Sequence, residues 1–183
     1  MKKSPVINIV ATGIGAALFF VLARYVAIPS PVPNTNISIQ YGLLSFMSCL
    51  FGVVPGALIA FVGHALSDFS FGWGVWWSWV IASGVAGVIM GFAAKKIDLA
   101  GGNFTTKDMI LFNVYQGIAH LVAWVVVAPI LDIVIYAEPV NKVFVQGLFA
   151  AGANIVTTAI VGTLLCLAYA KSRPAGGSLK KED

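Results

Sequence analysis

Two ionisable residues stand inside an apolar stretch of the sequence and are the first candidates for chemistry. His64 and Asp68 are four residues apart, so a helix places them on the same face. An ionisable side chain within a membrane segment costs free energy to bury and commonly marks a functional site. Close to the membrane surface that cost is small, and such a pair can serve structure alone. The spacing fits either a ligand-binding pair or a structural one.

A second group of polar and aromatic side chains forms a stripe farther along the chain. Its members are Asn113, Gln116, His120 and Trp124. Their spacing of three, four and four residues puts them on one helical face, which must meet other helices or a cavity rather than lipid. Either the stripe forms interhelical hydrogen bonds, or Gln116, His120 and Trp124 contact a ligand. Gln146 and Asn154 add polar groups from the next apolar segment.

Four of the five tryptophans are concentrated in one short segment. They are Trp73, Trp76, Trp77 and Trp79. Helical spacing turns the first three towards one side and Trp79 partly away. Tryptophans favour the membrane–water interface, so the group is either an interfacial belt or a stacking surface for a flat heterocyclic ligand. Trp73, Trp76 and Trp77 are the candidate ligand contacts.

The longest polar run between two hydrophobic segments is the loop at 29–41. Prolines at positions 29, 31 and 33 stop any helix, because each lacks an N–H and fixes φ. Uncharged hydrogen-bonding residues follow, and the candidate contacts among them are Asn34, Asn36, Gln40 and Tyr41. The loop is either an ordinary connector or an element that grips a neutral polar molecule.

Several kinds of chemistry lack their sequence signature. The sequence has no phosphate-binding P-loop, nucleophile elbow or zinc-helix motif, and Cys49 and Cys166 both lie in apolar runs. We therefore expect no enzyme activity, no metal and no cofactor. No pair of carboxylates stands in a membrane core position, and 183 residues is small for an inverted-repeat carrier. A chain that binds a solute without an energy source of its own requires an energising partner.

The composition requires a membrane. The 183 residues are 59% hydrophobic and only 10% charged, and the mean hydropathy is +0.92, whereas a soluble domain carries about 25% charged residues. The hydrophobic runs predict an all-α domain at 1–170 with six transmembrane helices, at about 6–28, 41–53, 56–69, 75–94, 109–128 and 142–170. Pro55 is expected to separate the second helix from the third, and Pro129 to end the fifth. We expect 105–108 to cap the fifth helix, 130–140 to lie near the interface, and 171–183 to be a disordered cytoplasmic tail.

The basic residues predict the orientation. Nine of the eleven lysines and arginines fall near the two termini or at 95–107. By the positive-inside rule both termini are then cytoplasmic. The loops at 29–40, 70–75 and 129–141 would consequently face outward together, with the candidate residues gathered around them.

Four segments resemble one family of membrane proteins. Residues 11–24, 28–41, 63–68 and 76–84 are similar to the substrate-binding S components of energy-coupling factor (ECF) transporters, most of all to the riboflavin-type branch. The resemblance implies a six-helix vitamin-binding protein of the bacterial plasma membrane, with the first outer loop as its lid. The vitamin would be riboflavin-like, hydroxymethylpyrimidine-like or pyridoxine-like, or cobalamin. A self-sufficient carrier or channel, or a scaffold without a ligand, remains an alternative.

The same resemblance implies partners. An S component docks through small residues of its first helix onto a transmembrane coupling component, the T component, which two ABC-type ATPases drive. In this sequence the corresponding residues are Ala11, Gly13, Gly15, Ala16 and Ala17. Small residues four apart let another helix approach closely, either within the chain or from a partner. No nucleic acid is expected as a partner.

Overall fold

The computed structural model describes residues 5–72 and 74–173, and nearly all of them are helical. Within this part of the chain, five helical stretches are long and apolar enough to cross a membrane. They are α1 (Pro5–Tyr25), α3 (Val53–Phe71), α4 (Trp77–Gly91) with the 3₁₀ turn η1 (Phe92–Lys95), the continuous stretch of α5 (Thr106–Leu121), η3 (Val122–Val127) and α6 (Ala128–Tyr136), and α7 (Val140–Ser172). The predicted second helix is α2 (Gln40–Phe51), which is apolar but shorter. The predicted all-α membrane bundle is confirmed, whereas the expected tail lies mostly outside the described residues.

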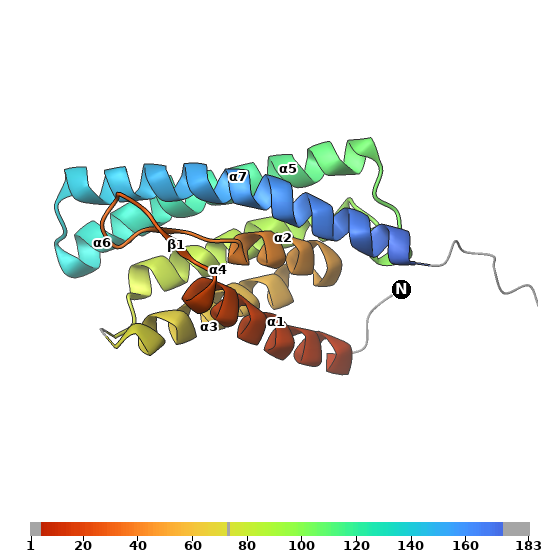
Figure 1. The fold of residues 1–183 in the computed structure, drawn as a ribbon, viewed down its shortest axis with the longest axis horizontal. Helices are drawn as coiled ribbons and strands as arrows, with labels where there is room; N and C mark the ends of the chain where they lie inside the picture. Colours follow the sequence, from red (N-terminus) through yellow and green to blue (C-terminus); the bar gives the residue numbers. More distant parts are fainter. Residues whose placement is uncertain (1–4, 73, 174–183) are drawn as a thin grey trace, which may run out of the picture.

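The helices run roughly along one axis, and the connections gather at its two ends (Figure 1). The start of α1, the start of α5 and the end of α7 lie at one end, beside the short turn η2 (Leu99–Gly101). The loop after α1, the turn between α3 and α4, and the connection from α6 to α7 lie at the other. The three loops that were expected to face outward are therefore at the same end of the bundle, called the loop end below.

The break between α2 and α3 is at Gly52 and not at Pro55. Gly52 has φ 94°, a conformation that side chains rarely adopt, and α3 begins at the next residue. Pro55 lies in the first turn of α3, where a missing N–H interrupts no helical hydrogen bond. The third helix is consequently 19 residues long, so the prediction of a short helix at 56–69 was wrong.

Pro129 does not end the fifth helix. The chain passes through the six-residue π-helical segment η3 and continues as α6, with Pro129 as the second residue of that helix. A π-helical turn changes the hydrogen-bond register, so a residue without an N–H can be accommodated there. The segment after Pro129 is therefore a helix that packs in the bundle. Asp132 is buried in this helix, whereas the sequence had placed 130–140 near the interface.

Close helix crossings depend on glycine. A Cβ placed on Gly87 of α4 would lie 2.2 Å from the carbonyl oxygen of Gly56 in α3, so the two backbones meet without side chains between them. In the same way, a Cβ on Gly147 of α7 would lie 2.0 Å from the carbonyl oxygen of Trp124. The second crossing brings α7 against the π-helical segment at the loop end.

The start of α5 follows the sequence closely. The side chain of Thr105 accepts a hydrogen bond from the backbone N–H of Asp108, whose carboxylate accepts one from the backbone N–H of Thr105. This reciprocal capping box satisfies two donors that a helix start leaves open. The predicted cap is confirmed, and the helix begins at Thr106 instead of 109.

The small residues of α1 do not form one exposed face. Ala11, Gly15 and Ala16 are buried within the chain, and a Cβ on Gly15 would meet the side chain of Ile59 at 2.6 Å. Only Gly13 and Ala17 of the predicted five are exposed. Helical periodicity explains the division, because residues one or two positions apart point in different directions. The three buried residues thus pack within this chain. The prediction of a docking face was wrong for Ala11, Gly15 and Ala16.

Candidate functional site

Two adjoining cavities lie at the loop end of the bundle. The inner one has a volume of about 130 Å³ and the outer one about 340 Å³. Four residues line both: Asn34, His64, Asp68 and Trp79. Among the predicted contacts, the inner cavity also has Asn36, Gln40, Tyr41, Trp124 and Asn154, and the outer one has Trp76. The loop at 29–41, α3, α4, η3 and α7 all contribute to this site.

The proline-rich loop folds over the inner cavity. Its two short strands, β1 (Ile28–Pro29) and β2 (Asn36–Ile37), pair antiparallel. At its tip the carbonyl oxygen of Pro33 accepts a hydrogen bond from Nε2 of Gln146, 2.8 Å away on α7. Asn34 has φ 57°, a left-handed conformation that asparagine tolerates better than most residues. The loop is thus held at its tip by one side chain from α7.

A chain of polar contacts links this loop's end to the tryptophan-rich turn. The hydroxyl groups of Tyr41 and Ser83 are 2.7 Å apart, and Nδ1 of His64 is 2.5 Å from the same serine oxygen. Nε2 of His64 is 3.4 Å from Oδ1 of Asp68, and Oδ2 of Asp68 accepts the backbone N–H of Trp76. The predicted His64–Asp68 pair therefore exists, and it connects α2, α3 and α4.

Asp132 organises the tryptophan-rich turn. Its Oδ1 accepts hydrogen bonds from Nε1 of Trp76 and the hydroxyl of Ser78, and its Oδ2 accepts one from Nε1 of Trp79 at 2.8 Å. Asp132 is 2% exposed, so these three donors replace the water molecules that would solvate an exposed carboxylate. Sequence reasoning missed this residue because it placed 130–140 at the interface. An acidic residue in the otherwise apolar 130–135 was the available signal.

Two of the tryptophans, Trp77 and Trp79, face differently from the prediction. Trp79 lines both cavities and lies 5.1 Å from Trp124 between ring centroids. Trp76 lines the outer cavity and stacks on Tyr136, whereas Trp77 is 48% exposed and lies against Phe61 on the outside. Helix α4 begins only at Trp77, so helical spacing does not apply to the residues before it. The predicted contact Trp73 lies outside the described residues.

The polar stripe of α5 serves mainly contacts between helices. Gln116 donates to Asn113 and to the carbonyl oxygen of Ile155. His120 is fully buried, with Thr158 3.1 Å from its Nε2 and the indole N–H of Trp124 donating to its Nδ1. Neither Gln116 nor His120 lines either cavity. His120 instead fixes Trp124, which does.

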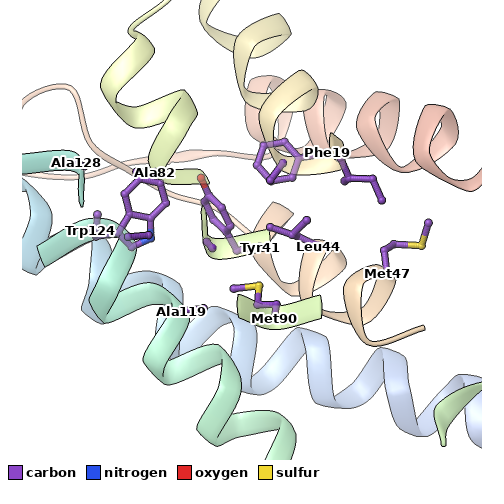
Figure 2. Packing of buried hydrophobic residues seen from close by; sticks show 14 of the residues in the cluster. Phe19, Tyr41, Leu44, Met47, Ala82, Met90, Ala119, Trp124 and Ala128 are labelled. Atoms are coloured by element: carbon purple, nitrogen blue, oxygen red, sulfur yellow. The ribbon is translucent and has the colours of Figure 1, made fainter. Parts of the chain in front are cut away.

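The inner cavity has an aromatic wall. Tyr41 stands between Phe19 and Trp124, with centroid distances of 5.2 and 5.4 Å (Figure 2). All three residues line the inner cavity. Their rings meet edge to face, an arrangement that fixes each ring in place. Such a wall suits a flat ring, while the neighbouring polar side chains supply hydrogen-bonding groups.

Charge at the site is negative. Asp68, Asp132 and Glu138 line the cavities, and the lysine that lines them, Lys142, is bound to Glu138 at 2.6 Å. Within residues 5–72 and 74–173, no group of three His, Cys, Asp or Glu side chains comes together as metal ligands. The arrangement can bind and enclose a small organic molecule.

Comparison with known proteins gives consistent results. A model of the family "ECF-type riboflavin transporter, S component" matches residues 3–171. A "UPF0397 protein" of Enterococcus faecalis is 51% identical over 181 residues, which is 99% of both chains. Another, of Exiguobacterium sp., is 53% identical over 175 residues and 96% of both chains.

A solved structure shares the fold. The crystal structure of FolT bound with folic acid superposes with a TM-score of 0.61, covering 86% of this chain and 95% of that one at 16% identity. The matched family is a transporter component and not an enzyme. Because its model spans nearly the whole sequence, and because the apolar helices suit a membrane, this multi-pass chain belongs to the family of ECF-type riboflavin transporter S components.

Proposed function

We propose that this chain captures a water-soluble vitamin or vitamin precursor in the two cavities beneath the loop at 29–41. The observation that carries the proposal is this pair of cavities, which have aromatic walls, polar side chains and a proline-rich cover. The outer cavity has a volume in the usual range of small-molecule sites, about 300–1,000 Å³. Membership of a transporter family supports the same reading.

The aromatic wall favours a ligand with a flat ring. Riboflavin-like, hydroxymethylpyrimidine-like and pyridoxine-like compounds all satisfy that condition, and cobalamin carries a flat corrin. Cobalamin, the largest of them, would require the loop at 29–41 to move away from the cavities. FolT, which shares the fold, was crystallised with folic acid. That case supports a heterocyclic ligand for a protein of this fold.

Delivery inward would depend on partners. The chain would sit in the bacterial plasma membrane with both termini in the cytoplasm, and would dock on a transmembrane coupling component that two ABC-type ATPases drive. The exposed small residues Gly13 and Ala17 on α1 offer a surface on which another helix can approach closely. Replacing Ala17 by leucine should then prevent docking while ligand binding persists.

The test that separates this function from a self-sufficient carrier is uptake into liposomes. The chain is reconstituted alone, and in parallel with its coupling component and ATPases, and uptake of the vitamin that it binds is followed with and without ATP. We expect uptake only in the complete complex with ATP. Uptake by the chain alone would favour the carrier or channel.

The role of the loop has its own test. The double change Asn34→Ala and Asn36→Ala removes two amides that line the inner cavity. If the loop is a cover that contacts the ligand, the double variant should fold normally and bind the vitamin more weakly. Unchanged affinity would assign the loop to connection alone.

A further inference from the structure

We propose, building on the proposed function, that the site accepts neutral or cationic ligands and rejects those that carry a carboxylate or phosphate, with Asp68 as the residue that makes this selection. The ligand class would be a heterocycle rich in hydrogen-bond donors, such as an aminopyrimidine, a pyridine amine or an uncharged ring system. The inference concerns the same two cavities, and it rests on the charges and open hydrogen-bonding groups around them.

The side chains that line the cavities carry a negative balance. Three of them are carboxylates: Asp68, Asp132 and Glu138. Against them stand Lys142 and His64, so the balance remains negative even when the histidine is protonated. Arg24 lies over the ring of Phe71 and does not line either cavity. An anionic ligand would therefore meet no free cation among the described lining residues.

Two of the three carboxylates are already engaged. Asp132 accepts three hydrogen bonds from Trp76, Ser78 and Trp79, so most of its capacity is used. Glu138 holds Lys142 at 2.6 Å in a contact one helical turn apart. These two acids support the walls of the outer cavity and contribute negative potential to it.

Asp68 is the carboxylate that remains open to a ligand. Among residues 5–72 and 74–173, its Oδ2 accepts one backbone N–H, from Trp76, and its Oδ1 has His64 Nε2 at the long distance of 3.4 Å. A carboxylate can accept about four hydrogen bonds, so this one retains capacity. Because Asp68 lines both cavities, a donor or a cation in either of them can reach it.

The inner cavity adds two amide side chains. Asn154 is 5% exposed and lines this cavity. The side-chain oxygen of Gln40, which lines the same cavity, is buried without a hydrogen-bond partner among residues 5–72 and 74–173. A buried polar atom without a partner is destabilising, so the Gln40 oxygen favours a ligand whose edge carries a hydrogen-bond donor.

The test uses matched pairs of compounds that differ by a phosphate. Purified chain in detergent is titrated by calorimetry with riboflavin and flavin mononucleotide, with pyridoxamine and its 5′-phosphate, and with aminohydroxymethylpyrimidine and its phosphate. For the pair that binds, the unphosphorylated member should bind at least about tenfold more tightly, because like charges repel strongly in a partly dehydrated cavity. Equal or tighter binding of the phosphorylated member would overturn the inference.

Asp68→Asn tests the assigned residue. This change should weaken binding of the preferred ligand and reduce the preference over its phosphate by several-fold. The matched control is Asp98→Asn: Asp98 lies near Asn8 at the start of α1 and lines neither cavity, so the change should leave both unchanged. If Asp68→Asn keeps the full preference for the unphosphorylated ligand, Asp68 is not the residue that makes the selection. The preference of the unaltered chain is a separate measurement and does not depend on whether the variant folds. If no member of any pair binds, the proposed function itself is contradicted for these ligands.

Discussion

Replacing Asp132 by asparagine tests the interior of the site most severely. The carboxylate offers two acceptor oxygens to three donors: Oδ1 to Trp76 at 2.7 Å and to Ser78, and Oδ2 to Trp79 at 2.8 Å. A carboxamide keeps one oxygen and replaces the other by an NH₂ group. In either orientation at least one donor then meets another donor.

The size of the effect follows from these contacts. A hydrogen bond to a charged group contributes roughly 1.5–3 kcal/mol, and a buried donor left without a partner costs about 1–3 kcal/mol. Relief of the penalty for burying a charge offsets part of this loss. We expect Asp132→Asn to lower the free energy of unfolding by about 2 kcal/mol or more. For a chain of this length, that corresponds to a decrease of roughly 4–8 °C in unfolding temperature.

The assay is thermal unfolding in detergent, followed by tryptophan fluorescence. Asp98→Asn is the matched control: the hydrogen bonds that the Asp98 side chain accepts from Gly101 and Asn103 are exposed, asparagine can keep the N-cap bond, and water can replace the other, so the unfolding temperature should stay nearly unchanged. The emission of Asp132→Asn should also change before unfolding, since either Trp76 or Trp79 loses its acceptor in each orientation of the carboxamide. An unfolding temperature within about 1 °C of the unaltered chain would refute the role assigned to Asp132.

Three further changes probe the loop, a helix crossing and the docking surface. Gln146→Leu removes the hydrogen bond to Pro33, and a loss of about 1 kcal/mol should weaken ligand binding roughly fivefold, mostly through faster dissociation in stopped-flow measurements. Gly87→Ala places a Cβ 2.2 Å from a backbone oxygen and should strongly destabilise the fold in thermal unfolding, whereas Gly117→Ala, with open space at its Cβ, should not. Ala17→Leu should retain ligand binding and lose co-purification with the coupling component; persistent co-purification would place docking elsewhere.

The sequence predicted the general layout because hydropathy and the distribution of polar residues largely decide it. The polar loop after the first helix, the His64–Asp68 pair and Asn154 could be placed near one side of a helical bundle from the hydrophobic runs and the distribution of basic residues. The structure brings them to adjoining cavities. Helical periodicity was sufficient for His64 and Asp68 because both lie in the regular helix α3.

Three local features could not be read in the same way. Pro129 normally stops a helix, and only the π-helical turn before it allows the chain to continue and bury Asp132. Helix α4 starts only at Trp77, and within it Trp77 faces outward while Trp79 lines the cavities, the opposite of the expectation for these two tryptophans. The small residues of α1 look equivalent in sequence, and only packing against α3 shows which are buried.

The most direct test of vitamin capture is a titration of the purified chain, in detergent, against a panel of water-soluble vitamins and their precursors. Trp79 and Trp124 line the inner cavity, so a bound ring should change tryptophan emission. We predict that one compound produces a saturable change at micromolar or lower concentration, with one ligand per chain. A panel in which no compound alters the emission at micromolar concentration would contradict capture of a vitamin by this site.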